Sequence, residues 1–193
     1  VDGDQLMSIC GNYMKQKGTL KKNTIVATVM SNLGMFLMGE REGIHIEKTK
    51  VGDRYVLENM LENGYNIGGE QSGHIIFLDE NTTGDGLLSA LHLLQVMTET
   101  KKKLSELASI MEVLPQALVN AKVPNHKKEH FEEYAEIAEA IAEVEAKFAG
   151  EGRVLIRPSG TEPLVRVMIE GKDQQLIESE AQKLAELISS IML

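Results

Sequence analysis

The sequence predicts an α/β protein, with a three-layer-like α/β domain followed by a smaller α+β domain. Strand-like and helix-like stretches alternate over about the first 110 residues, which is the pattern of α/β folds. Pro115 interrupts a helical segment, and the order of the elements changes after it. Hydrophobic residues make up 42% of the 193 residues, which is enough for a core. We therefore expect one domain over residues 1–114 and a second over residues 115–193.

The first part opens with a helical pattern, and a buried strand and a capped helix follow. Residues 24–30 are a short β-branched run, which is typical of a buried strand. Ser31 and Asn32 suit the N-cap of a helix over residues 34–41, and Gly43 suits its end. One strand–helix unit is expected here.

Two more strand–helix units follow. Residues 44–50 alternate apolar and polar side chains, as a half-buried strand does, and residues 51–62 form a helical pattern with Gly64 beyond its end. A third strand is expected at residues 74–78, before a helix over residues 87–99. Three leucines fall on one face of that helix: Leu87, Leu91 and Leu94.

The second part has the order β-α-β-β-α, which indicates an α+β domain. The expected elements are an extended stretch at 116–124, a helix at 131–148, strands at 153–158 and 164–170, and a closing helix at 174–193. Residues 126–150 contain seven Glu and three Lys, and this charge run is most simply the solvated face of the first helix.

Charge and composition exclude several classes of partner. The net charge of −9 argues against broad attraction to nucleic acid or to an anionic membrane, so neither partner is expected. Cys10 is the only cysteine, which excludes an intrachain disulfide and fits a reducing cytoplasm. No apolar run approaches the ~18 residues of a membrane span, and no secretory signal is evident. The chain begins at Val1 without an initiator Met, so we expect a piece of a longer chain.

The segment Arg-Pro-Ser-Gly-Thr-Glu-Pro at residues 157–163 has the donors that a phosphate requires. Guanidinium groups, hydroxyls and free backbone N–H groups bind phosphate from several directions. The two arginines lie on consecutive strands, so a hairpin brings both toward the loop, where the glycine lets N–H groups converge. The candidate phosphate-binding residues are Arg157, Ser159, Gly160, Thr161 and Arg166. The alternative is a rigid surface turn whose arginines pair with Glu162 and Glu170.

The segment Gly-Gly-Glu-Gln-Ser-Gly-His at residues 68–74 suits a polyol ligand. In an extended chain Glu70, Ser72 and His74 point to one side, and the flanking glycines leave the other side bare for a ligand. Carboxylate, hydroxyl and imidazole groups together accept and donate hydrogen bonds as sugar hydroxyls require. One His and one Glu at this spacing make a poor metal site. The alternative is a Gly-rich loop that enters a strand, with His74 satisfied locally.

Three other features favour structural roles. Asp2 and Asp4 lack the further acids of a calcium loop, and a helix cap is the better interpretation. Residues 82–86 lack the lysine of a P-loop and also suit a helix cap. Cys10 lies in an apolar helix without a nearby base, which indicates a buried structural thiol. The other histidines have no partner at ligand or catalytic spacing: His45, His92, His126 and His130.

Several of these segments together resemble one family. Residues 69–74 resemble the sugar-recognition loop of the α-D-phosphohexomutases, and residues 157–163 resemble their phosphate-binding loop. Three further stretches, at residues 28–34, 50–55 and 81–86, resemble the bacterial phosphoglucosamine mutase branch of that family. The resemblance runs in order from end to end of the chain.

The resemblance implies a four-domain enzyme of which this chain is the third and fourth domains. Enzymes of that branch interconvert glucosamine 6-phosphate and glucosamine 1-phosphate through glucosamine 1,6-bisphosphate, on the route to UDP-N-acetylglucosamine. A phosphoserine in the first domain transfers the phosphoryl group, and an Asp-rich loop in the second holds Mg²⁺. Neither the phosphoserine loop nor the metal loop is found in this sequence. At Asp2 and Asp4, the nearest match to the metal loop, Gln5 and Leu6 stand where that loop needs Asp and Arg. The chain is therefore expected to be inactive alone and to work with the N-terminal half of the same enzyme.

By resemblance, residues 1–114 bind the sugar through Glu70, Ser72 and His74. By the same resemblance, residues 115–193 bind the phosphate through Arg157, Ser159, Gly160, Thr161 and Arg166. The implied ligand is a phosphorylated amino sugar, and a homodimer is one assembly that the resemblance allows. Two alternatives stay open. One is a stand-alone, non-catalytic module that binds sugar phosphates, and the other is a phosphoglucomutase or phosphomannomutase of the same family.

Overall fold

The structure is a computed structural model that describes residues 1–150 and 152–193. Within these ranges the chain divides into two units, Val1–Val113 and Leu114–Leu193, and each unit has its own hydrophobic core. Both units combine helices with a sheet, which confirms the α/β fold class. No helix in the described ranges is long and apolar enough to cross a membrane.

The first unit is built on a four-stranded mixed sheet. Its elements are α1 (Gly3–Gln16), η1 (Lys21–Asn23), β1 (Thr24–Thr28), α2 (Leu33–Glu42), β2 (His45–Thr49), α3 (Asp53–Asn63), β3 (Ile67–Gly69), β4 (Ile75–Phe77), α4 (Gly86–Thr100) and α5 (Leu104–Ala108). The strand order is β2-β1-β3-β4. Strand β1 runs parallel to β2 and β3, and β4 runs antiparallel to β3.

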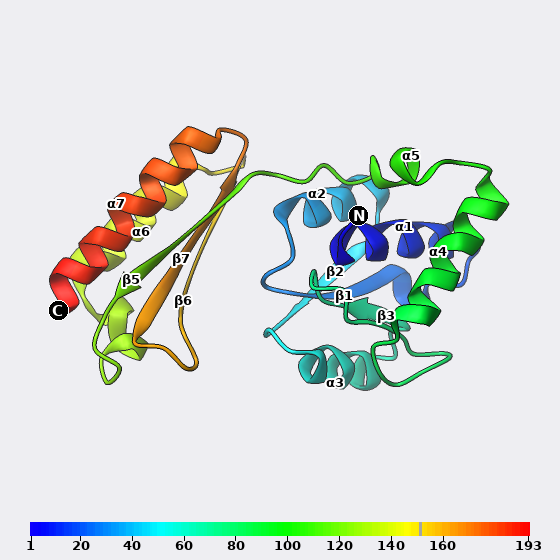
Figure 1. Ribbon diagram of the computed structural model, residues 1–193, viewed down its shortest axis with the longest axis horizontal. Helices are drawn as coiled ribbons and strands as arrows, with labels where there is room; N and C mark the ends of the chain where they lie inside the picture. The colour runs from blue at the N-terminus through cyan, green and yellow to red at the C-terminus, as the bar shows by residue number, and fades with distance from the viewer. Residues whose placement is uncertain (151) are drawn as a thin grey trace. The chain divides into compact units, whose positions relative to one another are not determined.

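Helices cover both faces of this sheet, with α1 and α2 on one face and α3 on the other (Figure 1). Strand β1 is consequently buried along its whole length. Ile25 and Ala27 belong to the main core cluster, whereas Val26 packs with Val56 and Met60 of α3. The β-branched run in the sequence therefore reflects a strand that lies between two layers of helices.

The caps of α2 and α3 agree with the sequence prediction. The Asn32 side chain accepts a hydrogen bond from the N–H of Gly34 at 3.0 Å and so begins α2. Gly43 and Gly64 end α2 and α3 in the left-handed conformation, with φ of +64° and +70°.

Strand β3 was not expected from the sequence. The pair Gly68 and Gly69 favours a loop, yet both residues lie in β3. Glycine occupies these positions because neighbouring atoms leave no room for a side chain. A Cβ on Gly68 would lie 2.9 Å from the carbonyl oxygen of Val26, and one on Gly69 would lie 2.4 Å from that of His74. Gly68 and Gly69 therefore serve close packing of the chain and leave no bare side for a ligand, whereas a Cβ on Gly73 would meet no described atom within 4 Å.

Helix α4 presents its leucine stripe to solvent. Leu87, Leu91 and Leu94 share one face, as the spacing indicates, but they are 74%, 56% and 55% exposed. The inward positions of α4 include Ser89 and Val96, which are buried. Amphipathic spacing thus locates a helix here without showing which face is covered.

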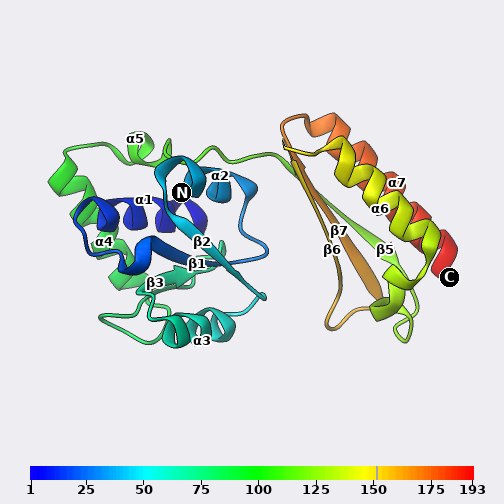
Figure 2. The same ribbon diagram turned by 180° about the vertical axis from the view of Figure 1, so that it is seen from behind.

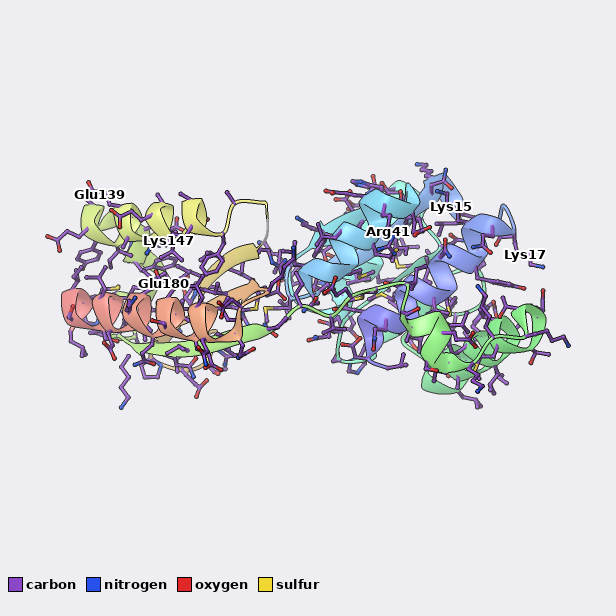
Figure 3. All side chains as sticks on the ribbon, turned by 90° about the horizontal axis from the view of Figure 1, so that it is seen from above. Lys15, Lys17, Arg41, Glu139, Lys147 and Glu180 are labelled. Atoms are coloured by element: carbon purple, nitrogen blue, oxygen red, sulfur yellow. The ribbon has the colours of Figure 1, made fainter. Side chains whose placement is uncertain are left out.

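The second unit is a three-stranded antiparallel sheet with two long helices. Its elements are β5 (Gln116–Lys122), η2 (Lys128–Glu133), α6 (Ala135–Lys147), β6 (Gly152–Pro158), β7 (Leu164–Gly171) and α7 (Gln174–Met192), and the strand order is β5-β7-β6. Both views show α6 and α7 on the same face of the sheet (Figures 1 and 2). The two helices are joined by an ion pair between Lys147 and Glu180 at 2.7 Å (Figure 3).

Alternation along β7 separates the two faces of this sheet. Val165, Val167 and Ile169 are fully buried in the core under the helices. The residues between them lie on the opposite face, where Arg166 stands directly opposite Arg157 of β6. The face without helices therefore carries both candidate phosphate-binding arginines.

Candidate functional site

The turn of the β6–β7 hairpin carries the candidate phosphate loop. The N–H of Ser159 donates to the carbonyl of Leu164 at 2.9 Å, and the N–H of Glu162 donates to the Ser159 hydroxyl oxygen at 3.3 Å. Ser159 is buried, with 2% of its surface exposed. The loop is thus held by its own hydrogen bonds, and the Ser159 hydroxyl keeps its proton for another acceptor.

Arg157 and Arg166 place two positive charges side by side. Arg166 Nη2 donates to Glu162 Oε2 at 3.0 Å, and its Nε is buried without a hydrogen-bond partner within the described ranges. Burial, followed by the charge of Arg166, lowers the pKa of Arg157. Like charges directly opposite one another destabilise a sheet, so an anion bound between these guanidinium groups would be stabilising.

The alternative interpretation is a surface turn in which the two arginines pair with Glu162 and Glu170, and only one of these two ion pairs is present in the part of the chain that the structure describes. Arg166 does pair with Glu162, but Glu170 pairs with Arg153, with 2.6 Å between Arg153 Nη2 and Glu170 Oε2. Within residues 1–150 and 152–193 no ion-pair partner is present for Arg157. One arginine of the pair is therefore left for a ligand.

The exposed tip of the loop offers backbone donors. The N–H groups of Gly160 and Thr161 donate to no backbone carbonyl within the described part of the chain. Gly160 does not have a positive φ, and a Cβ there would meet no atom within 4 Å. The turn therefore does not use the left-handed conformation that glycine allows, and the missing side chain leaves open space over the loop.

Lys128 is a residue at this site that sequence reasoning missed. It is 6% exposed, and its ammonium group donates to the carbonyl of Ser159 and, at 3.4 Å, to that of Glu162. The acid-rich run around it suggested a solvated face. The only available signal was that two adjacent lysines precede the helix.

Residues 70–74 form the turn of the β3–β4 hairpin instead of an extended strand. The N–H of Glu70 donates to the carbonyl of His74 at 3.0 Å, and Gly73 has a φ of +99°. The three candidate side chains nevertheless lie together. Ser72 Oγ is 3.2 Å from His74 Nδ1, and Glu70 Oε2 is 4.0 Å from the same nitrogen. The His74 side chain is 65% exposed and remains accessible to a ligand.

Two glycines outside the turn hold it in place. The N–H of Gly3, at the start of α1, donates to the carbonyl of Gln71 at 3.0 Å. The N–H of Gly52, before α3, donates to Glu70 Oε1 at 3.0 Å. The beginnings of α1 and α3 therefore position the turn, which the sequence pattern alone did not indicate.

The remaining chemical-looking residues have structural roles. Asp2 caps α1 and Asp85 caps α4 through side-chain acceptors, as expected. Cys10 is buried, which raises the pKa of its thiol to about 12, and His92 stacks on Phe77 with ring centroids 3.8 Å apart. Within the two described ranges, no group of three or more His, Cys, Asp or Glu side chains is placed to hold a metal ion.

Comparison with known families matches both units in order. The family model described as phosphoglucomutase/phosphomannomutase, alpha/beta/alpha domain III matches residues 2–114, and the C-terminal domain of the same family matches residues 118–187. The chain therefore belongs to the phosphoglucomutase/phosphomannomutase family.

The chain is also similar to individual curated relatives and to solved structures. The chain is 63% identical to the phosphoglucosamine mutase of Ruminiclostridium cellulolyticum and 64% identical to that of Acetivibrio thermocellus, over 97% of its own length. It spans 42% of the length of each of these relatives. A structure of Aspergillus fumigatus N-acetylphosphoglucosamine mutase in complex with GlcNAc-6P and magnesium has the same fold, with a TM-score of 0.80 and 17% identity. That match covers 100% of this chain and 44% of the fungal chain.

Proposed function

We propose that this chain is the sugar- and phosphate-recognition part of a phosphoglucosamine mutase, which interconverts glucosamine 6-phosphate and glucosamine 1-phosphate. The observation that carries the proposal is the pair of facing arginines beside a loop whose Gly160 and Thr161 N–H groups donate to no backbone carbonyl in residues 1–150 and 152–193. The high identity to two phosphoglucosamine mutases favours an amino sugar as the substrate.

Each unit supplies one kind of recognition. In the second unit Arg157 and Arg166 bind the phosphate charge, and Ser159, Gly160 and Thr161 add a hydroxyl or backbone N–H groups. In the first unit the carboxylate, hydroxyl and imidazole of the 70–74 turn bind sugar hydroxyls. The phosphate held here is the one that does not react, which fixes the sugar while its other end is phosphorylated or dephosphorylated.

Positioning of this kind is a large part of phosphoryl-transfer catalysis. The reacting phosphoserine and the Mg²⁺ ligands belong to other parts of the whole enzyme, and the described residues here offer no cluster that fits the metal. As part of this proposal, we expect the chain by itself to be inactive. In the whole enzyme the reaction passes through glucosamine 1,6-bisphosphate and leads toward UDP-N-acetylglucosamine.

Replacement of Arg157 tests the phosphate-binding role in the whole enzyme. Arg157→Met should lower kcat/KM for glucosamine 6-phosphate about tenfold or more, because a charge-assisted hydrogen bond contributes about 1.5–3 kcal/mol. Lys183→Met is the control, since Lys183 pairs with Glu180 on α7 at 2.8 Å and should leave kcat/KM within about twofold. Unchanged kinetics for Arg157→Met would show that the phosphate site is misassigned.

A comparison of substrates tests the amino-sugar preference separately. The whole enzyme should have a higher kcat/KM for glucosamine 6-phosphate than for glucose 6-phosphate. Equal values, or a preference for glucose 6-phosphate, would instead indicate a phosphoglucomutase of the same family.

A further inference from the structure

The side chain of Lys128 is buried, and its ammonium group lies against the candidate phosphate-binding loop at residues 157–163. Lys128 is the first residue of η2 and is 6% exposed, although residues 126–150 around it contain seven Glu and only three Lys. Its neighbour Lys127 is directed elsewhere and donates to the carbonyl of Met192 at the end of α7, at 2.8 Å. Two adjacent lysines thus contact different parts of the second unit.

The hydrogen bonds that the Lys128 ammonium group donates within the described ranges go to the two ends of the 159–162 loop. Its Nζ donates to the carbonyl of Ser159 and lies 3.4 Å from that of Glu162. Within the described ranges no carboxylate forms an ion pair with it. A buried charge without a counter-ion is costly, and a phosphate bound on the other side of the loop would reduce that cost.

The geometry of the peptide unit links Lys128 to the bound anion. In a trans peptide the C=O and the following N–H point in opposite directions, and the described residues contain no cis peptide bond. Because Lys128 holds the carbonyl of Ser159, the N–H of Gly160 points away from Lys128, toward the exposed side of the loop. The ammonium group also polarises that peptide, which makes the N–H a stronger donor.

We propose that Lys128 is a positioning residue for the phosphate: it fixes the 159–162 loop and strengthens the Gly160 N–H as a phosphate donor without touching the ligand. This inference rests on the proposed phosphate-binding function of the loop and adds a residue to it. It also explains why a lysine in an acid-rich segment is buried.

The test is a titration of the 193-residue chain with inorganic phosphate, followed through backbone NMR signals. Lys128→Met keeps the length of the side chain and removes its charge, and it should weaken phosphate binding about tenfold or more. Lys128→Arg keeps the charge and the donors and should recover most of that loss. Lys127→Met is the matched control, and its affinity for phosphate should stay within about twofold of the parent value.

Four outcomes would overturn the inference. A folded Lys128→Met chain that binds phosphate as the parent does would remove the role, and equal losses in Lys127→Met and Lys128→Met would show a general effect of charge. A Lys128→Arg chain as weak as Lys128→Met would show that side-chain shape, and not charge, sets the affinity. If phosphate does not shift the loop signals of the parent chain, the proposed phosphate-binding function fails as well. This result is distinguishable from the other three, in which the parent chain does bind phosphate.

Discussion

Glu162 holds one of the two arginines that we assign to the phosphate. Its carboxylate lies 3.0 Å from Arg166 Nη2 and is more than half exposed. An incoming phosphate must therefore displace this carboxylate or bind beside a second negative charge. The same contact keeps Arg166 near the loop before the ligand arrives.

Glu162→Gln should consequently strengthen phosphate binding by up to about fivefold, because an exposed ion pair of this kind contributes about 0.2–1 kcal/mol. Calorimetric titration with inorganic phosphate measures the change. Glu178→Gln is a suitable control, since Glu178 is on α7 and accepts a hydrogen bond from Gln174 there. Weaker binding by Glu162→Gln would show that Glu162 organises the site more than it competes with the ligand.

At the residue scale, the sequence predicts the groups that hairpin geometry brings together. Arg157 and Arg166 fall on consecutive strands on either side of a turn, and local geometry alone makes them neighbours. Lys128 could not be predicted, because its contacts with residues 159 and 162 depend on how η2 packs against a distant hairpin. The local composition even argued for the opposite environment.

At the scale of elements, the start of α1 supports the 70–74 turn. A Cβ on Gly3 would lie 2.2 Å from the carbonyl oxygen of Glu70 and 2.8 Å from that of Gln71. Gly86 holds the equivalent first position of α4, and a Cβ there would meet nothing within 4 Å. The two glycines thus form a matched pair for testing this contact.

Gly3→Ala should destabilise the first unit by about 1–3 kcal/mol and shift the amide signals of residues 70–74, because backbone atoms must move apart. Gly86→Ala should be neutral or stabilising by up to about 1 kcal/mol, since alanine is the better helix former. Urea unfolding followed by NMR signals of the first unit measures both. A Gly3→Ala chain with unchanged stability and an unchanged turn would contradict the support that we assign to α1.

An ion pair joins the ends of α1 and α4. Lys17 Nζ lies 2.8 Å from Glu99 Oε2, and hydrogen bonds from Lys17 and Tyr13 lower the pKa of Glu99 to about 2. A carboxyl group whose pKa is lowered by folding stabilises the folded state above its ordinary pKa, which is near 4.5. That contribution is lost as the pH falls toward about 2.

Glu99→Gln should therefore be less stable than the parent chain at neutral pH, and the difference should shrink between pH of about 4.5 and about 2. Because both side chains are substantially exposed, added salt should also reduce the difference. Urea unfolding at several pH values measures it. A difference that stays constant down to pH of about 2 would mean that the ion pair does not link the two helices.

The elements that the sequence predicted well are those with local signals. The β-branched run of β1 and the caps Asn32 and Gly43 determine their own conformations. Strand β3 has no such signal, because its glycines are selected by close contacts with β1 and β4. The leucine stripe of α4 illustrates the same limit, since helical spacing does not show which side is covered.

At the scale of the whole molecule, a chain with a net charge of −9 concentrates three cations at one loop. Arg157 and Arg166 lie on the face of the sheet without helices, and Lys128 lies beneath the turn. Overall charge therefore excludes broad anion binding but permits one local phosphate site. The 70–74 turn belongs to the other unit, so the proposed sugar site and the proposed phosphate site lie on different units.

The most direct measurement is a backbone NMR titration of the 193-residue chain with inorganic phosphate, glucosamine and glucosamine 6-phosphate. Inorganic phosphate should shift the signals of residues 157–162, and glucosamine 6-phosphate should shift these together with residues 70–74. Glucosamine without phosphate should leave residues 157–162 unchanged. If neither inorganic phosphate nor glucosamine 6-phosphate shifts the signals of residues 157–162, the assignment of this loop as the phosphate site is contradicted.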